Sequence, residues 1–285
     1  MMQTITQIDQ LRQQIHAWRM AGEKIAFVPT MGNLHRGHSS LVEQARSHGS
    51  KIVVSIFINP MQFDNQEDLA RYPRTIDDDK AVLESMDTDL LFLPTPEMIY
   101  PKGLDNTTFV EVPALSELFC GHSRPGHFTG VTTVVNKLFN LVQPDVAIFG
   151  EKDFQQLLLI RHMVADLFIN VEIIGAPTKR EQSGLAMSSR NNYLNSYQRE
   201  QQAPIIYQVL TDTKAQILSG NRDFDQLQHS AIERINGAGL STDFFSIQNA
   251  QDLSDATRDS QDLVILVAAF LDKARLIDNL AFQIK

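Results

Sequence analysis

Short apolar runs alternate with helical patterns through roughly the first 175 residues, and this alternation constrains the fold more than any other feature. The apolar runs lie at 24–30, 51–58, 89–93, 145–150 and 170–176, and helical patterns include 38–49, 129–142 and 153–167. Because parallel strands need a crossover between them, this order is typical of a parallel sheet covered by helices. The sequence therefore predicts the α/β class, with a Rossmann-like doubly wound parallel sheet.

The pattern changes after the segment "APTKREQSGLAMSSRNN", which ends at residue 192. Two polar helical stretches, at about 197–219 and 223–237, precede apolar runs at 242–250, 263–271 and 274–279. This order predicts a smaller C-terminal α+β domain, with the boundary near 177–184. We assign residues 1–178 to a Rossmann-like nucleotide-binding and catalytic domain and residues 179–285 to a smaller C-terminal α+β lid domain.

Composition narrows the possible partners and the cellular location. The formal net charge of -9 disfavours extended binding to nucleic acid. The longest apolar run, 263–271, is a buried strand rather than a membrane span, which needs roughly 20 residues. The N-terminal residues lack the pattern of an export or transit signal, and the single Cys120 cannot form an internal disulfide. We expect a cytoplasmic protein without a membrane or nucleic-acid partner.

The first apolar run ends in "PTMGNLHRGH", which has the features of an anion-binding turn. Gly32 and Gly37 allow the backbone to approach a ligand closely, and a helix starting near His38 offers N–H donors. His35 and His38 can donate to phosphate oxygens and, when protonated, offset charge on a departing phosphate. The alternative is that both histidines are surface residues of a capped helix.

A zinc site at His35 and His38 is only weakly supported by the sequence. A zinc site needs about four ligands, and neither HExxH nor paired-cysteine spacing occurs. Cys120, His122 and His127 form a looser cluster, for which loop packing is the better explanation than a metal site.

Two further segments have chemistry suited to phosphate. Gly150-Glu151-Lys152-Asp153 places a cation where a strand ends and a helix begins, and Ser188-Ser189-Arg190 sets two hydroxyl donors beside a permanent cation. Ligands of doubly wound sheets collect at the carboxyl ends of the strands. Each segment alone is a weak signal, whereas the combination favours a triphosphate site.

The combination resembles a known family. "PTMGNLHRGH" is similar to the HxGH signature of the nucleotidyltransferase superfamily, and "AMSSR" to its second, mobile phosphate-binding signature. The segments "VVSIFINPMQF", "YPRTIDDD", "SRPGHFTGV", "FGEKDFQQL", "GLAMSSRN" and "ILVAAFLDKARLIDN" resemble pantothenate synthetase (pantoate-beta-alanine ligase) in order and spacing. The resemblance covers nearly the whole chain.

This resemblance implies an ATP-dependent ligase that makes pantothenate in two steps. Pantoate attacks the α-phosphorus of ATP, which releases pyrophosphate and leaves pantoyl adenylate, and the β-alanine amine then displaces AMP. Neither step needs an enzyme nucleophile, which fits a chain without an evident serine or cysteine triad. A loop carrying Ser188 to Arg190 would shield the mixed anhydride from water. The resemblance also implies Mg²⁺ and a homodimer.

The resemblance assigns roles to individual residues. His38 would be the proton donor or electrostatic stabiliser. Gln62 and Gln156 would hold pantoate, with Gln62 also near β-alanine, although without the flanking motifs both read as exposed polar residues. The ATP site would be lined by Met31, Gly32, Asn33, Leu34, His35, Arg36, Gly37, His38, Gly150, Glu151, Lys152, Asp153, Lys179, Met187, Ser188, Ser189 and Arg190.

Some of these roles have an equally good structural explanation. Asp78 would help hold Mg²⁺ with the ATP phosphates, while the run Asp77-Asp78-Asp79 also reads as a solvated helix start. Arg124 and His127 would support the pantoate pocket, or they would only stabilise an Arg-Pro-Gly turn.

Departures from the family pattern remove none of the proposed catalytic groups. Arg36 stands where an acidic residue is common, Lys179 where an apolar one is usual, and Ser183 where aspartate is common; His122 lies in a variable place. The Lys179 position is one where main chain would meet adenine. Two alternative functions remain open at this point: a plain nucleotide adenylyltransferase and a non-catalytic nucleotide sensor.

Overall fold

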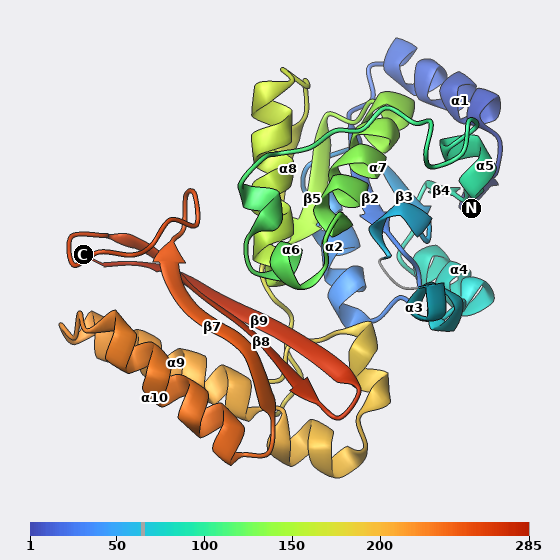
Figure 1. Cartoon of the computed structure of the whole chain (residues 1–285). Coiled ribbons are helices and arrows are strands. Elements are labelled where there is room, and N and C mark those ends of the chain that lie inside the picture. Colours follow the sequence, from blue (N-terminus) through green and yellow to red (C-terminus); the bar gives the residue numbers. More distant parts are fainter. Residues whose placement is uncertain (64–65, 285) are drawn as a thin grey trace. The chain divides into compact units, whose positions relative to one another are not determined.

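The computed structural model describes residues 1–63 and 66–284. The chain divides into two compact units (Figure 1). The first unit comprises Met1–Glu151 and Gln155–Pro177, and the second comprises Lys152–Phe154 and Thr178–Lys285. The assignment of 1–178 as the nucleotide-binding and catalytic domain and of 179–285 as a lid stays a prediction.

The first unit contains a six-stranded sheet in the order β1-β4-β3-β2-β5-β6, and every pairing is parallel. The predicted α/β class with a doubly wound sheet is confirmed, and each predicted strand is present. A short edge strand at the N-terminus was not predicted. The strands are β1 (Gln3–Ile5), β2 (Ile25–Thr30), β3 (Lys51–Ile56), β4 (Leu90–Phe92), β5 (Val146–Gly150) and β6 (Glu172–Ala176).

Strand β2 shows why the strand sequences are continuous apolar runs. Ala26 and Val28 share one core cluster with Val42 of α2 (Arg36–Arg46). Phe27 lies on the other face, with its ring centroid 6.4 Å from that of Phe139 in α7 (His127–Val142). Helices therefore cover both faces of the sheet, and a strand buried on both faces has no polar side (Figure 1).

The remaining helices of this part of the chain connect the strands. The predicted helix near His38 begins earlier, at Arg36, so His35 is its N-cap. The one predicted from 153 begins at Phe154, after a 3₁₀ turn. The other elements are α1 (Ile8–Met20), η1 (Pro60–Gln62), α3 (Gln66–Arg71), α4 (Ile76–Ser85), α5 (Pro96–Ile99), η2 (Leu115–Glu117), α6 (Cys120–Ser123), η3 (Glu151–Asp153) and α8 (Phe154–Asp166).

The strand order contains one topological switch point. From β2 the chain continues to β3 and β4 on one side, and it later returns to β5, on the other side of β2, and then to β6. The β2–β5 pairing joins Ala26 to Val146 and Phe27 to Ala147. In open parallel sheets the ligand crevice lies outside the carboxyl ends of the strands at such a point. Strands β2 and β5 therefore frame the position where a ligand is expected.

The second unit is an antiparallel sheet with helices packed against it, as predicted for the C-terminal region. The predicted strand at 263–271 is the central strand, β8. Apolar side chains of the sheet and of the two long helices form one buried core. The elements are η4 (Ser189–Tyr193), the π-helix η5 (Gln198–Gln202), α9 (Ile205–Leu218), α10 (Phe224–Gly237), β7 (Ser241–Asn249), β8 (Asp262–Leu271) and β9 (Ala274–Gln283).

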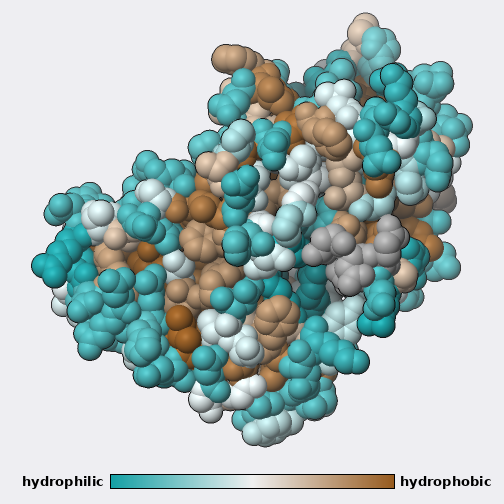
Figure 2. All heavy atoms as spheres, in the orientation of Figure 1, coloured by the Kyte–Doolittle hydropathy of each residue, from teal (hydrophilic) through white to brown (hydrophobic). Residues whose placement is uncertain are grey.

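Helix α10 of this unit has one buried apolar face and one face toward solvent. In α10, Leu227, Ala231 and Ile235 are buried at helical spacing. Figure 2 shows mostly hydrophilic surface over the outer side of α10. Across the described residues, no helix is both long enough and apolar enough to cross a membrane.

Candidate active site

The turn after β2 approaches its neighbours so closely that only glycine fits at one position. Gly32 has φ of +80°, and a Cβ there would lie 2.9 Å from Ile56 Cγ2 and 3.0 Å from Asp79 Oδ2. The next residue, Asn33, is also in the left-handed region, with φ of 52°. The backbone of this turn is therefore set by tertiary contacts, and any larger side chain at residue 32 would displace it.

Asp79, in the first turn of α4, fixes the same turn. The residue is only 2% exposed, and its carboxylate accepts hydrogen bonds from the N–H of Asn33 (2.9 Å) and of Leu34 (2.7 Å). Thr75 Oγ1 donates a third bond, of 3.3 Å. A buried carboxylate needs such donors, and here they are the backbone of the predicted nucleotide-binding segment. Sequence reasoning missed this role, because nothing in an acidic triplet indicates which member faces inward.

The two histidines cap helix α2 and stand side by side. His35 Nδ1 accepts from the Gly37 N–H at 3.1 Å, and His38 Nδ1 accepts from the His35 N–H at 3.3 Å. The ring centroids are 4.2 Å apart. A neutral imidazole that accepts at Nδ1 carries its proton on Nε2, so both rings are Nε2–H donors. The two histidines do cap the helix, as the alternative expected, and donation by their rings to an anion stays a prediction.

A buried amide, Asn59, orients Gln62. Asn59 is 1% exposed, and its Nδ2 donates to Gln62 Oε1 at 3.1 Å and to the Gly130 carbonyl at 3.0 Å. Gln62 Nε2 lies 3.0 Å from Met31 Sδ, so the amide has a defined direction. Sequence reasoning did not assign Asn59; its only signal was the Asn-Pro pair in "INPMQF", which also suits an ordinary turn.

Tyr100 completes this cluster from the end of α5. Its hydroxyl donates to Asn59 Oδ1 at 2.6 Å. Burial raises the pKa of Tyr100 above its ordinary value, and the hydrogen bond with Asn59 offsets this only in part. Tyr100 therefore stays a neutral donor, which leaves Asn59 Nδ2 as the end that faces Gln62.

Helix α7 packs directly against the segment that carries Gln62. A Cβ on Gly130 would lie 2.7 Å from the Met61 carbonyl carbon and oxygen, so the contact requires glycine. His127 Nδ1 is 2.7 Å from the Gln62 carbonyl oxygen, and since a carbonyl only accepts, His127 carries a proton on Nδ1. The predicted supporting role of His127 at the pantoate pocket is consistent with this contact but stays a prediction, as does that of Arg124.

The two glutamines at the start of α8 have different environments. Gln155 is buried, and its amide donates to the carbonyls of Leu115 and Leu118 at 2.9 and 2.7 Å, which ties the 115–120 loop to the helix. Gln156, the predicted substrate ligand, is half-buried. The same loop contains Cys120, whose N–H donates to Gln155 Oε1 at 3.2 Å. This contact is consistent with the loop-packing explanation for Cys120, which stays a prediction for the cluster.

The acidic run lies in the first turn of α4, as the solvated-helix alternative expects. Asp77 and Asp78 are exposed, and only Asp79 is buried. Among the side chains that the structure describes, no group of three His, Cys, Asp or Glu is arranged to hold a metal ion. Mg²⁺ typically takes one or two carboxylates together with substrate phosphates and water, and an exposed Asp78 suits that use.

A cavity of about 450 Å³ opens beside the glycine turn. It lies at the carboxyl ends of β2, β3 and β4, and its walls are mainly apolar, with Asp79 and Gly32 at one side. The lining residues are Met31, Gly32, Ile56, Phe57, Ile58, Pro60, Leu69, Pro73, Arg74, Thr75, Ile76, Asp79, Leu93, Pro94 and Pro96. The cavity therefore lies at the carboxyl-end edge of the sheet, where ligands are expected, but on the β3 and β4 side of the β2–β5 switch point.

In the second unit, residues 179–187 form a short antiparallel loop that presents Ser188. The Met187 N–H donates to the Lys179 carbonyl at 2.9 Å, and the backbones of Arg180 and Ala186 form an isolated antiparallel β-bridge. Arg180 forms a bidentate ion pair with Asp278, at 2.5 and 3.0 Å, and its guanidinium lies 3.7 Å from the Tyr207 ring centroid. Lys179 itself is exposed, and the contact that holds it is the hydrogen bond to its backbone carbonyl.

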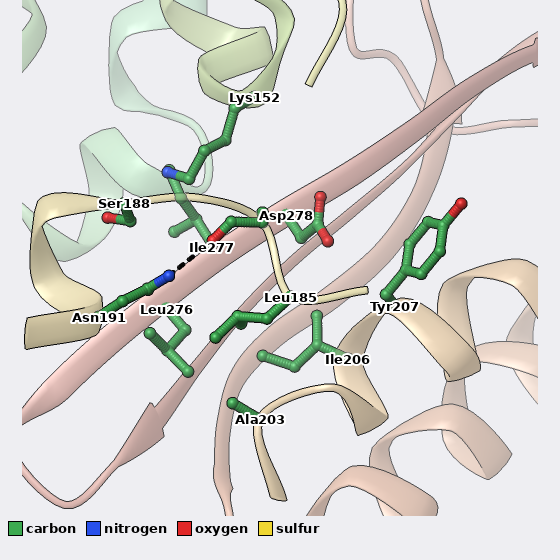
Figure 3. A pocket seen from close by; sticks show the side chains of 11 residues that line it. Lys152, Leu185, Ser188, Asn191, Ala203, Ile206, Tyr207, Leu276, Ile277 and Asp278 are labelled. Atoms are coloured by element: carbon green, nitrogen blue, oxygen red, sulfur yellow. Dashed lines mark hydrogen bonds between the residues drawn. The ribbon is translucent and has the colours of Figure 1, made fainter. Parts of the chain in front are cut away.

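The Ser188 segment begins a short helix. Ser188 Oγ accepts from the Arg190 N–H at 3.3 Å and so caps η4, while its own O–H remains a donor group. Asn191 Nδ2 donates to Glu181 Oε1 (2.9 Å) and to the Ala186 carbonyl (3.0 Å), which ties this helix to the loop before it. Figure 3 shows Lys152 and Ser188 at the same small cavity.

The predicted site residues thus fall into two sets, one in each unit. The first unit contains Met31, Gly32, Asn33, Leu34, His35, Arg36, Gly37, His38, Gln62, Asp78, Gly150, Glu151 and Gln156. The second contains Lys152, Asp153, Lys179, Met187, Ser188, Ser189 and Arg190. Their assignment to ATP, pantoate or metal stays a prediction.

A parallel sheet whose β2–α2 turn carries capping histidines at the topological switch point is typical of an α/β nucleotide-binding enzyme. The sequence model of pantoate-beta-alanine ligase matches residues 3–281. The chain therefore belongs to the pantoate-beta-alanine ligase family.

Full-length relatives agree with the family. The chain is 52% identical to pantothenate synthetase of Shewanella loihica over 282 residues, covering 99% of both chains. It is 53% identical to that of Photobacterium profundum, covering 98% of this chain and 94% of the relative. The chain is accordingly an enzyme, a ligase of pantothenate biosynthesis.

Solved structures agree with the fold as well. Pantothenate synthetase from Thermus thermophilus superposes with a TM-score of 0.90 at 42% identity, covering 98% of this chain and 99% of that chain. Pantoate-beta-alanine ligase from Francisella tularensis superposes with a TM-score of 0.82 at 37% identity, covering 98% and 97%. The Francisella structure is described as a complex with beta-gamma ATP and beta-alanine.

Proposed function

We propose that this chain condenses (R)-pantoate with β-alanine at the expense of ATP, through a pantoyl-adenylate intermediate, and that the residues predicted above carry the reaction. The observation that carries the proposal is the turn at 30–38: its backbone is held by Asp79, its histidines are preset as donors, and it leaves β2 at the switch point of the sheet. The identity of the substrates is inferred from membership of the pantoate-beta-alanine ligase family.

The first step transfers the adenylyl group. A carboxylate oxygen of pantoate bonds to the α-phosphorus of ATP, the bond from that phosphorus to the bridging oxygen breaks, and pyrophosphate leaves. Charge grows on the leaving group, so Nε2–H donors at His35 and His38 and the cation of Lys152 would stabilise the transition state. Met187 to Arg190 and Gly150 to Asp153 would bind the phosphates.

The second step forms the amide. The β-alanine amine attacks the acyl carbon, AMP leaves as the C–O bond breaks, and the nitrogen loses a proton. Gln62 and Gln156 would orient the acyl group, because a neutral amide both donates and accepts. In this proposal the enzyme contributes position and charge rather than a covalent intermediate.

Mg²⁺ would bind with the ATP phosphates, and we propose Asp78 as its protein ligand. The exposed carboxylate suits a metal that keeps several waters, and the ion would supply charge neutralisation at the phosphates. A homodimer and a cytoplasmic location also stay predictions.

The test is a stepwise assay with purified chain. Pyrophosphate release should require D-pantoate, and AMP release should follow addition of β-alanine. ATP consumption that ignores pantoate would contradict the proposal. A mononucleotide offered in place of pantoate should not be adenylated, which separates this ligase from a plain nucleotide adenylyltransferase.

A further inference from the structure

Lys152 is held by a strand that lies far from it in the sequence. Asn279, on β9, is 6% exposed, and its Nδ2 donates to the Lys152 carbonyl oxygen at 2.9 Å across 127 positions of sequence. Lys152 lies two residues after the end of β5, yet Lys152–Phe154 belong to the second unit. The backbone of the predicted phosphate-binding lysine is therefore attached to the C-terminal sheet.

The attachment point lies on a paired strand. Asn279 pairs with Leu266 of β8, and its own N–H donates to Asp278 Oδ1 at 2.8 Å. Asp278 is 5% exposed and holds Arg180 in a bidentate ion pair. A side chain placed on a paired strand and restrained by a neighbouring buried ion pair positions its partner more accurately than a loop residue can.

The lysine side chain shares its surroundings with the second predicted phosphate-binding segment. Lys152, Ser188 and Asn191 all line one cavity, whose volume of about 10 Å³ suits roughly one water (Figure 3). The cavity is too small for a nucleotide group, so it is a packing site between the lysine and the Ser188 segment. Asn191 in turn ties that segment to the 179–187 loop.

We propose that Asn279 is a positioning residue that holds Lys152 beside Ser188–Arg190, so that the lysine and the serine segment bind phosphate as one body. This inference rests on the proposed role of Lys152 in binding ATP. It assigns a function to a residue that contributes no group to the substrates and acts through the Lys152 backbone.

The first experiment replaces Asn279 with leucine, which has a similar shape but no donor. Asn279→Leu should raise the KM for ATP about fivefold or more, the equivalent of one lost hydrogen bond, and leave the KM for β-alanine within about twofold. The readout is pantoate-dependent pyrophosphate release, with urea unfolding of each variant. A KM for ATP that stays at the wild-type value would overturn the inference.

Gln248→Leu is the matched control. Gln248 is a buried amide (5% exposed) on β7 of the same sheet, and its Nε2 bonds to Ser246 rather than to Lys152. Its loss should leave the KM for ATP unchanged, and the urea midpoint of each variant shows how far packing is affected. If both variants raise the KM for ATP equally, the effect is general loss of packing and the inference is wrong.

A double-mutant cycle separates this inference from the proposed function. Lys152→Met should raise the KM for ATP, and adding Asn279→Leu should raise it no further, because Asn279 acts through the lysine. Additive effects would show that Asn279 acts by another route and would overturn the inference alone. An unchanged KM in Lys152→Met would overturn the proposed role of Lys152 itself.

Discussion

The Asp79 carboxylate accepts a 2.7 Å hydrogen bond from the backbone N–H of Leu34, a residue 45 positions earlier in the chain. Its second oxygen accepts from the Asn33 N–H. The contact joins the first turn of α4 to the turn after β2, and it holds a left-handed backbone that would otherwise be one of many loop conformations. Activity and stability should both respond when contacts of this kind are removed.

Asp79→Asn should slow adenylation by roughly tenfold or more and cost about 1–3 kcal/mol of stability, because an amide nitrogen would face a backbone N–H without an acceptor. Pantoate-dependent ATP–pyrophosphate exchange and urea unfolding measure the two effects. Asp77→Asn is the control, since Asp77 is exposed in the same helical turn. Wild-type exchange by Asp79→Asn would show that the turn does not need this support.

His38→Ala should lower the adenylation rate at saturating ATP by roughly 10²-fold, the effect of removing a donor to developing charge. It should also cost about 1 kcal/mol, because His38 Nδ1 accepts the His35 N–H at the start of α2. Single-turnover pyrophosphate release measures the rate. His16→Ala, at an exposed position of α1, should leave it unchanged. An unaffected rate in His38→Ala would dismiss the catalytic role.

Gly130→Ala should raise the KM for pantoate several-fold. The new methyl group would lie 2.7 Å from the Met61 carbonyl, below ordinary contact, so the segment carrying Gln62 must move. The helix-propensity gain of about 1 kcal/mol for Gly to Ala would offset part of the stability loss. Gly237→Ala, where a Cβ meets nothing within 4 Å, should be neutral or slightly stabilising with unchanged KM. Equal behaviour of the two variants would contradict the packing argument.

Tyr100→Phe should change how stability depends on alkaline pH. Burial raises the pKa of Tyr100 above its ordinary value of 10.0, so above that pH the unfolded chain releases the proton while the folded chain keeps it. The stability that Tyr100 contributes is therefore fully present below pH 10 and is lost as pH rises beyond it. The variant should lose about 1 kcal/mol at neutral pH and show a shallower decline above pH 10. Urea unfolding at several pH values compares the slopes, and parallel slopes would count against this assignment.

Asp278→Asn should destabilise the second unit by about 3–5 kcal/mol, because it leaves the mostly buried Arg180 guanidinium without its carboxylate partner. The exposed pair Arg234–Asp212 offers the comparison, since Asp212→Asn should cost about 0–1 kcal/mol. Urea unfolding of both variants gives the difference. Similar costs would mean that solvent screens the Arg180–Asp278 pair as it does a surface pair.

The sequence by itself determined the element types, and it supplied the hypothesis for the chemistry of the site. Strand β2 is apolar on every face, and so it was recognisable as a buried parallel strand without any coordinates. The histidines, Lys152 and Ser188 to Arg190 were predicted to bind phosphate because few residue types can neutralise it, and that role stays a prediction. These inferences need only local periodicity and the properties of single side chains.

Only the tertiary structure decided which side chains support that chemistry. Asp77, Asp78 and Asp79 are identical in type, and burial alone distinguishes the one that holds the turn. In the sequence, nothing distinguishes Asn59 and Asn279 from ordinary polar residues. In the fold, each side-chain amide donates to a backbone carbonyl of a distant segment. Strand order and long-range hydrogen bonds depend on pairing across many positions of chain, and such pairing leaves no periodic signal in a single sequence.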